Sequence, residues 1–152
     1  MIQDVKVKQL KLFSDDRGFL TEVLKEGDDI FAGEIKQTTY TETLPGVIKA
    51  FHWHKLQWDI WFVARGMAQV VLYDLRPTSP TFRQTNVFFA GERNPQVIAI
   101  PPGVAHGYRV LGNEKVGLLY HTTKAYAGND PDEERIPFDD IAIGFDWSTK
   151  NR

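Results

Sequence analysis

Cysteine is absent from the 152 residues of the sequence, which excludes disulfide bonds and thiolate metal sites. Disulfides are rare in the cytosol, so the lack of cysteine fits that compartment. No run of apolar residues approaches the roughly 20 that a membrane span needs, and the charged, alternating start MIQDVKVKQLKLFSDDRG has no apolar core of signal-peptide length. We therefore expect a cytoplasmic protein without a membrane partner.

An excess of positive charge is absent as well. The sequence has 18 Lys and Arg against 20 Asp and Glu, which gives a net charge of −2 at pH 7. Nucleic-acid-binding domains usually show a basic excess or stripe, so no nucleic-acid partner is expected. The hydrophobic share of 42% is typical of a globular chain, and no low-complexity linker interrupts it. Because this length suits one ordinary domain, we predict a single domain over residues 1–152.

Helical periodicity is scarce too, because no segment of 12 or more residues combines it with helix caps. The chain offers short alternating or β-branched runs instead: VKVKQLKLF, FLTEVLK, EIKQTTYTET, VIKAFHWH and QVIAI, with two joined strands in DIWFVARGMAQVVLYDLR. Many short strands at spacings of about ten residues are typical of a sandwich or barrel. We predict an all-β fold, with one helical turn around DPDEER in the acidic tail.

Histidine is present in an informative pattern. His52 and His54 lie two apart on a predicted strand, so both imidazoles face the same side. A tight turn at Lys55–Trp58 is expected to bring Asp59 back on the neighbouring strand, and His106 follows in PPGVAH. Three imidazoles and a carboxylate are a ligand set for Fe, Mn, Ni or Zn. The alternative is that these histidines only pack within strands.

The spacing of these residues resembles the two-part signature of the cupin superfamily, G-x5-H-x-H-x4-acid-x6-G followed by P-x-G-x2-H. The matching residues are Gly46, His52, His54, Asp59, Gly66, Pro101, Gly103 and His106. The resemblance implies a double-stranded β-helix of the jelly-roll type. It leaves two alternatives for the histidines: a divalent metal held by His52, His54, Asp59 and His106, or a barrel that keeps the fold without a metal.

A second resemblance covers nearly the whole chain, from about Leu10 to Trp147. The segments SDDRGFLTEV, YDLRPTSPTF, IPPGVAHGYRVLG and LLYHTTKAYAGNDPDEERIPFDDIAIGFDW, in this order, resemble the dTDP-4-dehydrorhamnose 3,5-epimerases, which are cupin-fold isomerases of sugar-nucleotide biosynthesis. In that chemistry a C4 ketone acidifies the protons at C3 and C5, a base removes one, and an acid returns a proton to the opposite face. The resemblance implies such an epimerase for dTDP-rhamnose and polysaccharide biosynthesis, acting without a cofactor.

The same resemblance assigns roles to residues of this chain. His52, at the end of the KAFH segment, takes the place of the family's base, and Tyr120 takes the place of its acid. His106 corresponds to a histidine that lies near the substrate's sugar in the family, and the position of Asp59 lies within the family's substrate pocket. The residues implied for binding the nucleotide-sugar substrate are Arg17, Phe19, Glu22, Gln37, Lys49 and Tyr126. Arg17, Phe19 and Glu22 are expected to act across the interface of a homodimer, in which the N-terminal strand packs on the partner.

Departures from the family pattern centre on the histidine segment. Asp59 stands where the family has a lysine suited to the C4 oxyanion, and an anion beside an enolate hinders the reaction. His54 stands where the family has glutamine, and no aspartate follows Trp147 in STKNR to orient the base. Two interpretations follow: an epimerase in which Asp59 orients or charges a histidine, or a cation at His52, His54, Asp59 and His106 that polarises a carbonyl as a Lewis acid.

Three further functions stay open at this point. Sugar-nucleotide 3,4-ketoisomerases of the cupin fold share the H-x-H-K segment with a glycine fourteen residues after its first histidine, as His52 and Gly66 are spaced here. The chain is also compatible with a nucleotide-sugar binding protein without catalytic activity, or with a metal cupin acting on a different small molecule.

Overall fold

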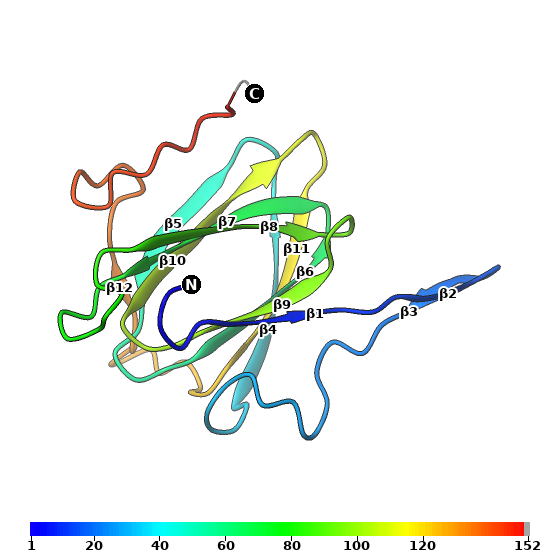
Figure 1. Ribbon diagram of the computed structural model, residues 1–152, viewed down its shortest axis with the longest axis horizontal. Coiled ribbons are helices and arrows are strands. Elements are labelled where there is room, and N and C mark those ends of the chain that lie inside the picture. The colour runs from blue at the N-terminus through cyan, green and yellow to red at the C-terminus, as the bar shows by residue number, and fades with distance from the viewer. Residues whose placement is uncertain (151–152) are drawn as a thin grey trace.

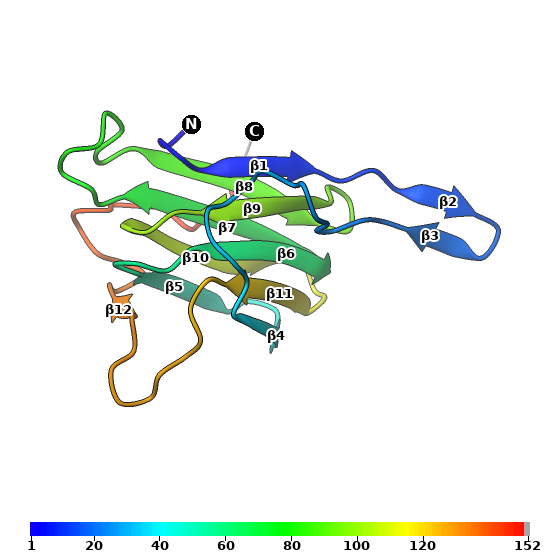
Figure 2. The same cartoon turned by 90° about the horizontal axis from the view of Figure 1, so that it is seen from below.

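Two five-stranded sheets face each other and form a flattened barrel, from which a two-stranded hairpin projects (Figures 1 and 2). This architecture comes from a computed structural model that describes residues 1–150. Within those residues there is no helix, and hence no helix that could cross a bilayer. The predicted all-β jelly roll is confirmed.

The strand order shows how segments that are distant in sequence meet. The first sheet runs β1 (Lys6–Gln9), β9 (Gln96–Ile100), β6 (Asp59–Arg65), β11 (Val116–Thr122) and β4 (Gln37–Thr43). The second runs β12 (Glu134–Arg135), β5 (Ile48–Trp53), β10 (Val104–Leu111), β7 (Met67–Asp74) and β8 (Thr85–Gly91). The hairpin consists of β2 (Phe13–Asp15) and β3 (Gly18–Leu20).

Apolar side chains from both sheets fill the space between them. Val70 and Leu72 of β7 meet Ile98 of β9 and Leu118 of β11 in one continuous cluster, and each is at most 2% exposed. Their alternation along each strand places every second side chain in this interior. Burial of such side chains contributes about 1.5–3 kcal/mol each.

The outer faces of the sheets are covered by irregular segments. Val71 and Tyr73 of β7 point away from the interior and pack under Ile143 and Trp147 of the C-terminal segment. Figure 1 shows this segment running along the β5 side of the barrel. Residues 23–31 cover the other sheet in the same way, over Ile60 and its neighbours. The central strands are therefore buried on both faces, which explains why runs such as QVVLY and QVIAI lack polar alternation.

Two predicted elements are wrong. The run FLTEVLK forms a strand only up to Leu20, because Val23 and Leu24 pack on the outer face of the first sheet rather than extending a ladder. The helical turn expected around DPDEER is the short strand β12, which pairs along β5 with Glu134 opposite Trp53. Backbone pairing to an exposed sheet edge satisfies the peptide groups better than an isolated turn of helix.

The turn that follows the histidine segment also differs from the prediction. Asp59 does not return beside His52 on a neighbouring strand, because β5 and β6 lie in different sheets. The chain crosses from one sheet to the other at residues 54–58. At the far end of β6, Gly66 turns the chain into β7 with φ of 70°, and a Cβ there would lie 2.5 Å from the carbonyl oxygen of Lys115. Glycine is required at that turn for both reasons.

Candidate active site

A cavity of about 440 Å³ opens between the two sheets, next to the histidine segment. Its wall is mixed, with aliphatic, aromatic, basic and acidic side chains, as is typical of small-molecule sites. The residues that line it are Thr41, Ile48, Lys49, Ala50, Phe51, His52, Asp59, Trp61, Tyr108, Leu118, Tyr120 and Arg135.

His52 and Tyr120 face this cavity from opposite sides. His52 lies on β5 in the second sheet, and Tyr120 lies on β11 in the first. Both also line a second, smaller cavity of about 180 Å³, which contains Gln37 and Tyr126. The two cavities share His52, Asp59 and Tyr120, so these residues stand where the cavities meet.

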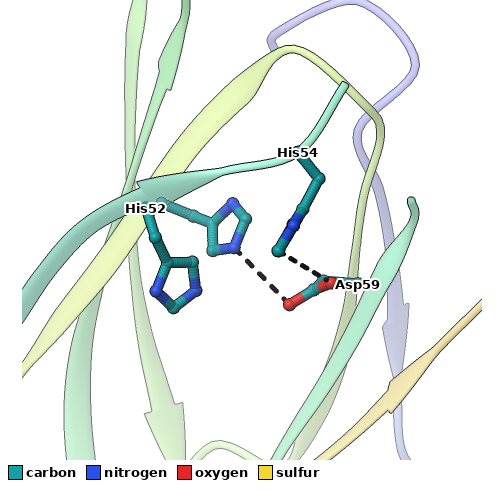
Figure 3. A group of neighbouring side chains, drawn as sticks. His52, His54 and Asp59 are labelled. Carbon is teal, nitrogen blue, oxygen red and sulfur yellow. Dashed lines mark ion pairs between the residues drawn. The ribbon is translucent and has the colours of Figure 1, made fainter. Parts of the chain in front are cut away.

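Asp59 is a buried carboxylate, 2% exposed, at the base of the site. It accepts hydrogen bonds from the Gln57 amide at 2.7 Å and from the indole N–H of Trp61 at 3.1 Å. Its oxygens also lie 3.4 Å from Nε2 of His54 and 3.5 Å from Nε2 of His106. Figure 3 shows the contact between His54 and Asp59 as a dashed line.

The two histidines that face Asp59 have the same tautomer. Nδ1 of His106 is 2.9 Å from the carbonyl oxygen of Val104, and Nδ1 of His54 contacts the carbonyl oxygen of Asp132. A carbonyl only accepts, so each Nδ1 carries a proton and donates it. In the neutral imidazole, Nε2 then has a lone pair directed at a carboxylate. Nε2 of His106 accordingly has no hydrogen-bond partner among the described residues, although the side chain is 1% exposed.

Burial and neighbouring charge set the protonation of the site. Burial lowers the pKa of His52 well below its usual value, and the nearby His106 adds to this, so His52 is neutral. For His54, burial opposes the charged form, but the hydrogen bond and charge of Asp59 outweigh burial and raise the pKa. Burial likewise opposes ionisation of Asp59, yet His106 and His54 hold its pKa well below the usual range. The site thus contains a neutral imidazole beside an ion pair.

The same groups fit a divalent cation in donor type. One ligand atom from each of His52, His54, Asp59 and His106 lies within 4.8 Å of the others. Metal–nitrogen and metal–oxygen bonds of about 2.0–2.2 Å place ligand atoms up to about 4 Å apart, so a small contraction would complete such a site. The expected grouping of these four residues is therefore present in the fold.

Positions of the predicted substrate-binding residues divide into two groups. Lys49 lines the larger cavity, and Gln37 and Tyr126 line the smaller one, where the side chain of Gln37 accepts from the Tyr126 backbone N–H at 2.9 Å. By contrast, Arg17 and Phe19 lie on the hairpin that projects from the barrel in Figures 1 and 2, and neither residue lines the two cavities. Glu22 follows the hairpin and pairs with Lys25 at 3.1 Å.

Sequence reasoning missed three residues of the site: Gln57, Asp132 and Arg135. The carboxylate of Asp132 accepts from the backbone N–H groups of Lys55, Leu56 and Gln57 at 2.8–3.0 Å, and so holds the turn between the two sheets. The run of acidic residues around Asp132 resembles a solvated turn in sequence. A proline-flanked Asp that caps three consecutive amides is recognisable only once the turn is known.

A jelly roll with a histidine and a tyrosine lining one cavity between its two sheets is typical of a cupin-type enzyme, and comparison with known proteins agrees. The family model for dTDP-4-dehydrorhamnose 3,5-epimerase matches residues 1–152. The chain is 50% identical to the spore coat polysaccharide biosynthesis protein SpsL of Bacillus subtilis (strain 168), with 100% of both chains covered. The chain belongs to the dTDP-4-dehydrorhamnose 3,5-epimerase family, a family of isomerases, which confirms the resemblance seen in the sequence.

Solved structures give the same result. The dTDP sugar isomerase of Desulfovibrio desulfuricans G20 superimposes with a TM-score of 0.88 at 25% identity, covering 99% of this chain and 94% of that chain. The dTDP-6-deoxy-D-glucose-3,5-epimerase of Legionella pneumophila Philadelphia 1 was solved in complex with dTDP-4-keto-L-rhamnose. It superimposes with a TM-score of 0.87 at 25% identity, covering 99% of this chain and 82% of that chain.

Proposed function

We propose that this protein epimerises a dTDP-4-keto-6-deoxy sugar at a carbon next to the 4-keto group, without a cofactor. The observation that carries the proposal is the placement of His52 and Tyr120 on opposite walls of one cavity, each from a different sheet. Inversion of a carbon centre needs a base on one face and an acid on the other. Membership of the epimerase family supports the same chemistry.

His52 acts as the base in this proposal. Its low pKa keeps the imidazole neutral and able to accept a proton. The C–H bond at C3 or C5 breaks, the proton passes to His52, and the electron pair moves into an enolate with charge on the C4 oxygen. Tyr120 then gives its hydroxyl proton to the opposite face of the carbon, and the ketone re-forms. Proton exchange with solvent restores His52 and Tyr120.

Asp59 does not oppose this reaction as strongly as its sequence position suggested. Its negative charge faces His54, whose raised pKa favours the imidazolium, at 3.4 Å. An ion pair of this kind presents little net charge to an enolate in the cavity, whereas an isolated carboxylate would repel it. We propose that His54 thereby compensates for the lysine that the family has at the position of Asp59.

Incubation with dTDP-4-keto-6-deoxy sugars in deuterated water tests the proposal. Wild-type protein is expected to incorporate deuterium at C3, C5 or both, which mass spectrometry and NMR can locate. Tyr120→Phe should exchange the abstracted proton yet form epimer about 100-fold more slowly, because the returning acid is lost. If no such sugar acquires label or changes configuration with the wild-type protein, the proposed function is wrong.

A metal-dependent reaction is a second candidate, favoured by one observation. The buried Nε2 of His106 has a free lone pair within a four-residue cluster of suitable donors. Elemental analysis of protein purified without chelators tests it: about one equivalent of a transition metal, lost in His106→Ala, would support a metal site. Less than about a tenth of an equivalent would exclude it.

We also propose that the protein acts as a cytoplasmic homodimer. The projecting hairpin exposes 64% of Phe19 and 63% of Leu20, and apolar groups at such a tip are typical of an interface. Packing on a partner would bring Arg17, Phe19 and Glu22 toward the partner's substrate. Light scattering should give twice the chain mass for wild type and the single-chain mass for Phe19→Asp/Leu20→Asp; a wild-type monomer would contradict the dimer.

A further inference from the structure

The short strand β12 places a basic residue next to His52, the proposed general base. Arg135 pairs directly opposite His52 in the β12–β5 register. Two backbone hydrogen bonds, at 2.8 and 2.9 Å, join Ile136 to Phe51 immediately beyond that pair. On the other side, Lys55 Nζ lies 2.7 Å from the Glu134 carboxylate. The backbone of Arg135 is thus fixed on both sides, next to His52.

Arg135 faces the larger cavity, whereas its neighbour Glu134 does not. Along a strand, successive side chains point to opposite faces, and Arg135 lines the cavity while Glu134 pairs with Lys55 outside it. The guanidinium makes contacts of 2.8–2.9 Å with Glu133, and 83% of the Arg135 side chain is exposed. A surface ion pair of this kind is weak and easily exchanged for another anion.

Two basic side chains are among the residues that line the larger cavity. Among the described residues, the fully charged side chains that line it are Lys49, Asp59 and Arg135. Asp59 is paired with His54 at 3.4 Å, so Lys49 and Arg135 set the charge that a ligand meets. Lys49 lies on β5 and contacts Thr41 through Nζ at 3.1 Å. Two cations that line the same cavity as His52 suit a ligand that carries two negative charges.

We propose that Arg135 binds the diphosphate of the nucleotide-sugar substrate, exchanging Glu133 for phosphate oxygens when the ligand enters. A guanidinium offers a planar fork of donors that matches phosphate oxygens in pairs, whereas the ammonium of Lys49 is a point charge. The inference rests on the proposed function, because the ligand is taken to be a nucleoside diphosphate sugar. It adds a binding residue on a segment for which the sequence predicted a helical turn.

Calorimetric titration with dTDP and with thymidine tests this role. Arg135→Gln is expected to bind dTDP about tenfold more weakly, the usual effect of losing a charge-assisted hydrogen bond, and to bind thymidine as wild type does. Arg135→Lys should recover part of the loss. Glu133→Gln should bind dTDP a few-fold more tightly, because a competing carboxylate is gone, and should gain less than twofold in the Arg135→Gln background.

Lys55→Gln is the matched control. It removes the same charge from the same β12–β5 region, but Lys55 lies outside the cavity, so dTDP affinity should stay within about twofold of wild type. Equal affinity of wild type and Arg135→Gln for dTDP would overturn the inference alone. So would an unchanged dTDP affinity with a reduced kcat, because Arg135 would then act on the reacting sugar. Failure of wild type to bind dTDP at all would overturn the proposed function.

Discussion

Two side-chain carboxylates, Asp59 and Asp74, are buried among residues 1–150, and their surroundings differ sharply. Asp74, 0% exposed, ends β7 and accepts five hydrogen bonds of 2.7–3.0 Å from Arg76, Ser79 and Thr81. Asp59, 2% exposed, begins β6 and accepts two hydrogen bonds, of 2.7 and 3.1 Å, with two histidines at the longer distances of 3.4 and 3.5 Å. Asp74 closes a loop, whereas Asp59 borders a cavity.

The comparison separates a buried carboxylate that stabilises the fold from one that is placed to take part in chemistry. A carboxylate whose lone pairs are all occupied by fixed donors has no capacity left for a ligand or a proton. Asp59 faces groups that themselves change protonation, and it shares their cavity with His52 and Tyr120. We therefore expect substitutions near Asp59 to alter activity and substitutions near Asp74 to alter stability.

Replacing the proposed base should have the largest effect. His52→Ala is expected to lower kcat by about 10³-fold or more, because general-base catalysis contributes about 10²–10⁴-fold. Steady-state assays and deuterium exchange measure the loss. The denaturation midpoint should change little, because the side chain borders an open cavity. Retention of more than a tenth of wild-type kcat would exclude His52 as the base.

Asp74→Asn tests the structural side of the comparison. Loss of the charge leaves the Arg76 guanidinium, 2.8 Å away and only partly exposed, without its partner. We expect the free energy of unfolding to fall by about 2–4 kcal/mol, as measured by urea denaturation. This is somewhat less than the roughly 3–5 kcal/mol for breaking a fully buried charge pair, because Arg76 is partly exposed. Activity per folded molecule should remain near wild type. A variant as stable as wild type but inactive would reverse the roles assigned to the two carboxylates.

Asp59→Asn should show the opposite profile. The amide keeps the shape but loses the charge that favours the His54 imidazolium, so kcat is expected to fall by about 10- to 100-fold while unfolding changes by less than for Asp74→Asn. Measuring kcat and the free energy of unfolding for both variants, Asp59→Asn and Asp74→Asn, tests this difference. Wild-type kcat in this variant would show that Asp59 has no part in the reaction.

The smallest expected effect is on the stability of the fold at low pH, to which Asp74 should contribute. Burial opposes its ionisation, but the bonds from Arg76, Ser79 and Thr81 outweigh burial and lower its pKa far below the unfolded value of 3.8. A carboxyl with a depressed folded pKa stabilises the fold above about pH 4 and loses that contribution as pH falls. Between pH 5 and pH 3, wild type should lose about 1 kcal/mol more than Asp74→Asn in urea denaturation. Equal losses would contradict this.

Local pattern predicted much of the barrel, because strand alternation and turn residues act between neighbours in sequence. The prediction failed where distant packing decided the outcome. The run FLTEVLK was predicted as a strand, yet the strand ends at Leu20, and Val23 and Leu24 pack on a sheet face instead. The segment around Arg135 has the charge of a solvated turn, yet it pairs with β5. In both cases a partner remote in sequence supplies the contacts.

The sequence by itself determined the class of fold and the family, because spaced motifs and strand periodicity are local properties. It also predicted His52 as the base and Tyr120 as the acid. It placed His52, His54, Asp59 and His106 in one group, and the structure confirms that they converge. Only the tertiary structure decided that Asp59 crosses to the other sheet, which histidines face it, and that Arg135 stands beside His52. Those relations depend on contacts between residues far apart in the chain, and the closed barrel fixes all of them together.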